Sequence, residues 1–167
     1  MKWMFFIALV VSMGTAQATV SVEEKDGLKW YTDLDEAHEA AKGKKPIFGF
    51  FTGSDWCGWC KLLQKDVFAK QAFIDWANEN VILLEIDFPK RTAQSTELKQ
   101  QNQNLQQALG VRGYPTVWFF TSNKNPETGA YNLTRMGSTG YPRGAVKGKE
   151  EVKFLEDANK ILSTTKK

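Results

Sequence analysis

Short continuous apolar runs alternate along the chain with longer stretches in which apolar residues recur every three or four positions. A short apolar run is typical of a strand buried on both faces of a sheet, whereas the longer spacing indicates an amphipathic helix. Core strands are predicted over residues 46–51, 81–88 and 117–120, and an edge strand over residues 131–136. Residues 28–31 fit a short strand or a packing segment, and residues 20–27 show little pattern.

Helical spacing predicts a first helix that starts near Thr32 or Asp33 and ends at Gly43, because both residues suit a helix N-cap. Further helices are predicted over residues 57–67, 71–80, 96–109 and 149–162. Their inward positions are expected to be Leu62, Leu63, Val67, Phe73, Ile74, Trp76, Ala77, Leu98, Leu105, Ala108, Leu109, Val152, Leu155 and Ile161. Helices that alternate with strands in this order define an α/β domain with a mixed sheet.

The N-terminus has the features of a secretory signal peptide. Lys2 supplies a positive charge, residues 3–13 are almost wholly apolar, and residues 16–18 (Ala-Gln-Ala) form a small-x-small cleavage site. The alternative is an uncleaved membrane anchor, although the apolar run is short for a membrane span. We therefore expect a signal peptide over residues 1–18 and a single domain over residues 19–167, located in the periplasm or secreted.

Composition and charge exclude some classes of function. The formal net charge is +3 and no block of basic residues stands out, so a nucleic-acid partner is not expected. With 42% hydrophobic residues, the chain has enough apolar material to build a core without structural staples.

The only two cysteines are Cys57 and Cys60, and they lie where a predicted strand turns into a predicted helix. A helix N-terminus favours negative charge, so a Cys57 thiolate is stabilised there. An exported protein can instead carry a structural disulfide. A bridge that spans two residues closes a very small loop, however, and loop-closure entropy then stabilises the fold least. The spacing therefore favours a redox-active pair.

A second informative stretch is residues 110–116, which precedes the aromatic strand over residues 117–120. Pro115 lies directly before this strand, although proline cannot donate a hydrogen bond to a sheet. A cis peptide bond before Pro115 would account for its position.

Two separated motifs together resemble the thioredoxin superfamily. Residues 56–61 (Trp-Cys-Gly-Trp-Cys-Lys) resemble its active-site motif. Residues 111–116 (Val-Arg-Gly-Tyr-Pro-Thr) resemble its cis-proline loop, and are especially similar to the loop of protein disulfide isomerase domains. The lead-in to Cys57 and the end of the strand at residues 87–89 are similar to exported bacterial thioredoxin-like proteins. The resemblance covers residues 30–162 and implies a thioredoxin fold, with helices on both faces of a central mixed sheet.

The resemblance also implies roles for individual residues. Cys57 would be an exposed attacking thiol at a helix N-terminus, and Cys60 the buried resolving thiol. Trp56 would shield the pair, and Pro115 would lie against the sulfur atoms. Tyr114 would offer its backbone to an extended substrate segment in a strand-like pairing.

One departure from the family concerns proton transfer. Thioredoxins carry a buried aspartate that handles the proton of the resolving thiol, and the matching position here is Phe50 or Phe51. The lysine that accompanies this aspartate corresponds to Leu83. The nearest candidate proton acceptors by sequence are Asp55 and Glu85. Their alternative interpretations are a solvated loop acid and an outward-facing strand residue.

A second departure is Trp59, which stands where isomerases and strong oxidants of the superfamily have a histidine. Without that histidine the Cys57 thiolate is less stabilised, which favours a reductase. The only histidine, His38, is expected on the first helix as a surface or partly packed residue, and one histidine cannot form a metal site. Trp56, Trp59 and Tyr114 are a candidate apolar docking patch.

The function predicted from the sequence is that of an exported thiol–disulfide oxidoreductase that acts on proteins with disulfides or thiols. No flavin or nicotinamide motif is present, so we expect no cofactor and a protein electron donor, for which a membrane-bound reductase is a candidate. The alternatives are a disulfide oxidase or isomerase, and a binding module without turnover. Such a module would hold a protein partner or a soft metal such as Cu(I).

Overall fold

Residues 22–164 are described in the computed structural model of the protein. The predicted signal peptide over residues 1–18 therefore lies outside the described residues.

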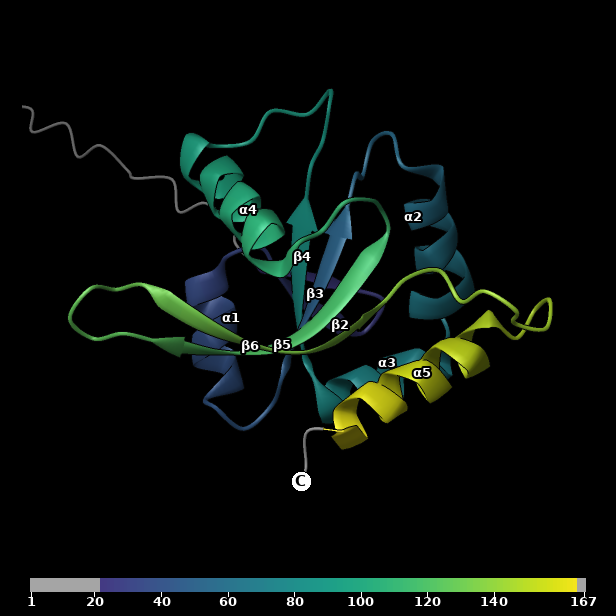
Figure 1. The fold of residues 1–167 in the computed structure, drawn as a ribbon. Helices are drawn as coiled ribbons and strands as arrows, with labels where there is room; N and C mark the ends of the chain where they lie inside the picture. The colour runs from purple at the N-terminus through teal and green to yellow at the C-terminus, as the bar shows by residue number, and fades with distance from the viewer. Residues whose placement is uncertain (1–21, 165–167) are drawn as a thin grey trace, which may run out of the picture.

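A six-stranded mixed sheet forms the centre of the molecule, with the strand order β1-β2-β4-β3-β5-β6 (Figure 1). The parallel pairs are β2 with β4 and β3 with β4, whereas the outer pairs and β3 with β5 are antiparallel. The central position of β3 and β4 follows from their apolar sequences, because both faces of these strands are covered. The strands are β1 (Val22–Lys25), β2 (Leu28–Tyr31), β3 (Ile47–Thr52), β4 (Ile82–Asp87), β5 (Thr116–Lys124) and β6 (Tyr131–Thr139).

Helices cover both faces of the sheet, as the sequence predicts (Figure 1). One face carries α1 (Leu34–Ala41) and α4 (Thr96–Leu109). The other face carries α2 (Gly58–Leu63), the π-helix η1 (Gln64–Phe68), α3 (Gln71–Asn80) and α5 (Glu150–Thr164). Within residues 22–164, no helix combines the length and the apolar character that a membrane span requires.

Each face of the sheet has its own hydrophobic core, and β3 alternates between them. Phe48 and Phe50 lie in the core under α2, α3 and α5, whereas Ile47 and Phe51 lie in the core under α1 and α4. Because side chains on both faces of β3 are buried, the sequence of this central strand is continuously apolar. Cys57 and Cys60 belong to the first of these two cores.

Several side chains predicted to face inward are exposed. Leu62 is 41% exposed, Val152 is 58% exposed, and Ala108 also faces solvent. The buried positions of each helix are three or four residues apart, and these side chains lie beside that narrow stripe. In α5, for example, Phe154 and Ala158 are the buried pair.

Strand β1 is the element that the sequence did not predict. It pairs with β2 through a tight turn at Asp26 and Gly27, both of which have positive φ. Three of its four residues are exposed, because it is an edge strand with one neighbour. An edge strand of this kind leaves no apolar signal in the sequence.

Candidate functional site

The two cysteines form a disulfide at the N-terminus of α2, with their Cα atoms 5.3 Å apart. Strand β3 leads into this position through a turn in which the N–H of Cys57 donates to the carbonyl of Gly53 at 2.7 Å. Cys57 is the N-cap of α2, and its Sγ accepts a hydrogen bond from the N–H of Cys60 at 3.2 Å. The first cysteine therefore lies where helical N–H groups stabilise negative charge on sulfur.

Burial of the pair differs from what the resemblance implied. Cys60 is fully buried, as expected, but Cys57 is only 5% exposed and does not project into solvent. Both cysteines belong to the hydrophobic core cluster beneath α2, and their sulfur atoms are bonded to each other.

Trp56 covers one side of the loop before the disulfide, and it is held from several directions. Its indole Nε1 donates to the carbonyl of Phe88 at 2.8 Å, and its ring meets the ring of Tyr114 at 87° with centroids 5.6 Å apart. The Lys90 ammonium lies 4.3 Å from its ring centroid, a cation–π contact. A Cβ on Gly53 would lie 2.3 Å from this indole, so the close packing of Trp56 requires glycine there.

Asp55 is an anchor for a neighbouring loop. Its carboxylate accepts hydrogen bonds from the backbone N–H groups of Lys90, Arg91 and Thr92, the shortest at 2.6 Å. These bonds, with that of Lys90 first, lower the pKa of Asp55 below its ordinary value. A carboxylate whose oxygens already accept backbone hydrogen bonds, and whose pKa is lowered, is poorly suited to accept a proton from Cys60. The alternative prediction of a solvated loop acid also missed this role.

Glu85 does not point outward, as one interpretation of the sequence had it. It is the register partner of Phe50 in the parallel pair β3–β4, and paired residues project from the same face of a sheet. That face is the one on which Cys60 is buried. Glu85 lines a cavity of about 480 Å³ beside the cysteine helix, together with Lys61 and Gln64 from α2 and η1.

Burial raises the pKa of the Glu85 carboxyl to about 7, and it is the largest cause of the shift. The negative charges of Asp87 and Glu23 raise the pKa further, and Lys25 lowers it. A carboxyl with this pKa exchanges protons near neutral pH, which is what proton transfer to or from a thiol requires.

The proline loop and Trp59 line one groove. The Tyr114–Pro115 peptide bond is cis, and the Tyr114 hydroxyl accepts a hydrogen bond from the side chain of Gln106 at 2.7 Å. Trp59 is 60% exposed, and its ring meets that of Tyr141 at a centroid distance of 5.2 Å. Tyr141 belongs to a glycine-rich loop whose contribution the sequence did not reveal.

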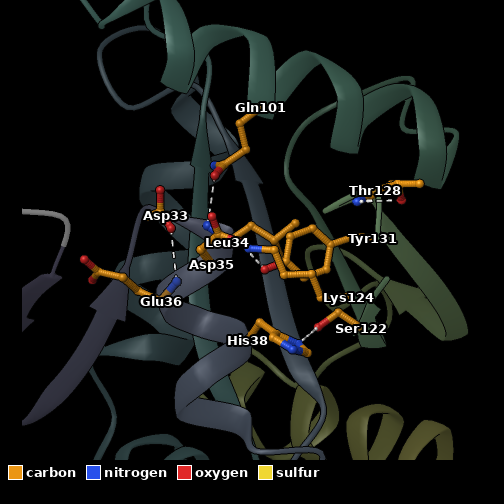
Figure 2. Close-up of polar contacts among 11 residues, drawn as sticks. Asp33, Leu34, Asp35, Glu36, His38, Gln101, Ser122, Lys124, Thr128 and Tyr131 are labelled. Atoms are coloured by element: carbon orange, nitrogen blue, oxygen red, sulfur yellow. Dashed lines mark hydrogen bonds and ion pairs between the residues drawn. The ribbon is translucent and has the colours of Figure 1, made fainter. Parts of the chain in front are cut away.

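His38 lies away from the disulfide, on α1 and the opposite face of the sheet. Figure 2 shows its ring beside Ser122, and its Nδ1 lies 2.9 Å from the Ser122 hydroxyl. The ring also meets Tyr131 edge-on, so His38 is the partly packed residue that the sequence predicts. Within residues 22–164, no group of three or more His, Cys, Asp or Glu side chains is arranged to hold a metal ion.

A central mixed sheet, a disulfide at the start of the helix after β3 and a proline loop before β5 define a protein of the thioredoxin fold. The thioredoxin-like domain family matches residues 34–137, which is more than half of the chain. The chain therefore belongs to this family.

Similar proteins include two from Chlamydia pneumoniae. The chain is 33% identical over 110 residues to the disulfide bond reductase DsbH, and this match covers 66% of this chain and 63% of the relative. It is 25% identical to the thioredoxin-related protein DsbJ, over 87% of this chain and 40% of that relative. A solved structure of the oxidoreductase DsbH has 28% identity and a TM-score of 0.67, and the match covers 91% of this chain and 95% of that one. The chain thus spans less than two thirds of the length of these two curated relatives.

Proposed function

We propose that this protein is an exported thiol–disulfide oxidoreductase that reduces disulfides in other proteins. The observation that carries the proposal is the Cys57–Cys60 disulfide at the N-terminus of α2, next to an open groove. The naming of one relative as a disulfide bond reductase supports it, and so does Trp59 in place of a motif histidine. Export rests on the predicted signal peptide over residues 1–18.

The reaction would run in two exchanges. The Cys57 thiolate attacks one sulfur of the substrate disulfide, forms a mixed disulfide and releases the other substrate sulfur as a thiolate. The Cys60 thiolate then attacks the Cys57 sulfur, which breaks the mixed disulfide and releases the second substrate thiolate. Two electrons pass to the substrate, and the protein is left with the Cys57–Cys60 disulfide. A protein dithiol donor must then reduce it, and we propose a membrane-bound reductase for this step.

Glu85 is our candidate for the group that accepts the Cys60 proton before the second exchange. It faces the side of the sheet on which Cys60 is buried, and its raised pKa lets it take up a proton near neutral pH. Glu85→Gln should slow release of the mixed disulfide about a hundredfold, which is the usual scale of general-base catalysis. Formation of the mixed disulfide by Cys57 should change much less.

Insulin reduction in the presence of dithiothreitol tests the activity, and Cys57→Ala should abolish it. In Cys60→Ala the mixed disulfide cannot be resolved, so substrate should stay attached to Cys57 and be seen by mass spectrometry. A Cys57→Ala, Cys60→Ala double variant is the matched control. If Cys60→Ala traps nothing, the mechanism is wrong, and if the wild type also fails to reduce insulin, the protein is a binding module without turnover.

The reduction potential of the pair tests the direction of the reaction. We expect a value near or below about −250 mV, as in thioredoxin-like reductants. A value between about −120 and −180 mV would place the protein with oxidants and isomerases, and the argument from Trp59 would be wrong.

A further inference from the structure

A groove of about 1030 Å³ opens beside the disulfide and is lined by Trp59, the proline loop and the loop that follows β6. We call it the Trp59 groove. Tyr114 and Pro115 line it together with Tyr141 and Arg143, and α5 also contributes lining side chains. Its volume lies at the upper limit for small-molecule sites, which suits a larger occupant such as a polypeptide segment.

The aromatic wall of the groove is fixed in place. The Tyr141 hydroxyl donates to the Asp66 carboxylate at 2.8 Å, and the Tyr141 ring in turn packs against Trp59. Asp66 is on the π-helix η1, which directly follows the cysteine helix α2. An exposed tryptophan that packs against a fixed tyrosine is suited to binding, because part of its side-chain freedom is already lost before a partner packs against it.

The loop after β6 lies close to the proline loop. Gly140 lies so close to the proline loop that a Cβ there would be 3.1 Å from the carbonyl oxygen of Pro115. The loop after β6 is thus in backbone contact with the loop that the sequence predicts for substrate pairing. This contact holds the start of the loop that carries Tyr141 and Arg143 against the proline loop.

The charged side chains of the groove differ in whether they are paired. Arg143 is exposed and forms no ion pair within residues 22–164. Among the lining side chains of α5, Asp157 pairs with Lys153, whereas the Glu150 carboxylate accepts a hydrogen bond from the N–H of Gly148 and keeps its charge. Arg143 is therefore the cation of the groove that has no carboxylate partner within residues 22–164, and it can pair with an anionic group of a substrate.

We propose that the Trp59 groove selects extended protein segments that carry a bulky apolar side chain close to the reactive cysteine and an acidic side chain further along. The apolar side chain packs on the exposed surface of the Trp59 ring, next to Tyr141, and the acidic one pairs with Arg143. This inference rests on the proposed reductase function and names the kind of substrate that the same site prefers.

The experiment compares three peptides, each linked through its cysteine to a small thiol by a mixed disulfide. One peptide carries the apolar and the acidic residue, one has alanine in place of the apolar residue, and one has lysine in place of the acidic residue. For the wild-type protein, alanine should lower kcat/KM about tenfold, the effect of an emptied apolar pocket. Lysine should lower it about fivefold, as expected for one ion pair at the rim.

Arg143→Glu should reverse the preference, so that the lysine peptide becomes the better substrate. Lys147→Glu is the matched control, because it makes the same charge change in the same exposed loop but does not line the groove. Tyr141→Ala should remove the discrimination between the apolar and alanine peptides, whereas Tyr141→Phe keeps the ring and should retain it.

The inference is overturned if wild-type protein turns over all three peptides equally, or if Lys147→Glu reverses the preference as strongly as Arg143→Glu. Glutathione disulfide separates this failure from failure of the proposed function. Wild-type protein that reduces glutathione disulfide but does not discriminate among the peptides is a reductase without this selectivity. Wild-type protein that reduces neither glutathione disulfide nor any peptide contradicts both proposals.

Discussion

At the scale of single residues, Glu85 should make the stability of the fold depend on pH. Its pKa is raised from about 4.5 to about 7 in the folded protein, so the folded state binds this proton more tightly than the unfolded state. The stabilisation by the neutral carboxyl is complete below pH 4.5 and is lost as the pH rises through 7. Between pH 5 and 8 the wild type should therefore lose on the order of 2–3 kcal/mol more than Glu85→Gln does.

Urea unfolding of both proteins at several pH values measures this difference. Glu79→Gln is the control, because Glu79 is an exposed acid on α3 and the substitution makes the same change of charge. If the wild type and Glu85→Gln show the same pH dependence, the Glu85 carboxyl is ionised in the folded protein at neutral pH. It would then be poorly suited to accept the Cys60 proton.

The residues of the candidate site were predictable from sequence to the extent that they belong to local motifs. Cys57, Cys60 and Pro115 are marked by their spacing and by a proline before a strand. Asp55 and Tyr141 act through partners more than thirty residues away in the chain. No local pattern in the sequence records such a contact, so their roles emerge only in three dimensions.

At the scale of elements, the β5–β6 hairpin is fastened to α1 by the network in Figure 2. The Asp35 carboxylate accepts a hydrogen bond from the Lys124 ammonium at 2.6 Å and another from the Tyr131 hydroxyl. Lys124 is the first cause and Tyr131 the second of a lowered Asp35 pKa. Tyr131→Phe removes one of these bonds but keeps the ring against His38, so it should lower the free energy of unfolding by about 1 kcal/mol.

Chemical denaturation measures the effect, and Thr134→Ala on the exposed side of β6 is a control that should change stability by less than about 0.5 kcal/mol. Insulin reduction should stay at the wild-type level in both variants, because the network lies on the face of the sheet opposite the disulfide. A Tyr131→Phe protein as stable as the wild type would mean that water replaces the lost hydrogen bond at no cost.

The elements themselves could be predicted wherever burial imposes a period on the sequence. Helix α4 was predicted with its observed limits from the helical spacing of its apolar residues, and the structure shows Ser95 and Gly110 as the caps at its two ends. Strand β1 could not be predicted, since an edge strand with exposed side chains needs no apolar residues. The inward faces of α2 and α5 were predicted too broadly. The sheet covers only a narrow stripe of each helix, and the apolar side chains beside that stripe are exposed.

At the scale of the whole molecule, the α/β class followed from the order of apolar segments, and the motifs near Cys57 and Pro115 narrowed it to one fold. The cavity beside Glu85 and the Trp59 groove were out of reach of sequence analysis. Each is lined by residues from several distant segments, so each depends on how the elements pack.

The redox state of the disulfide should be coupled to the stability of the whole domain. The two quantities belong to one thermodynamic cycle, in which a pair that is harder to reduce in the folded protein than in the unfolded chain must stabilise the fold when it is oxidised. In a reductase that stabilises the Cys57 thiolate weakly, the disulfide is harder to reduce in the folded protein than in the unfolded chain. The oxidised protein should therefore be more stable than the reduced protein, by about 2 kcal/mol if loop-closure entropy is the main contribution.

Urea unfolding with and without dithiothreitol measures this difference, and the Cys57→Ala, Cys60→Ala double variant should not respond to the reductant. The opposite order, with the reduced protein more stable, is the mark of an oxidant whose folded state stabilises the thiolate. That outcome would contradict the assignment as a reductase even if the protein reduces insulin in the assay, because excess dithiothreitol can drive an oxidant backwards.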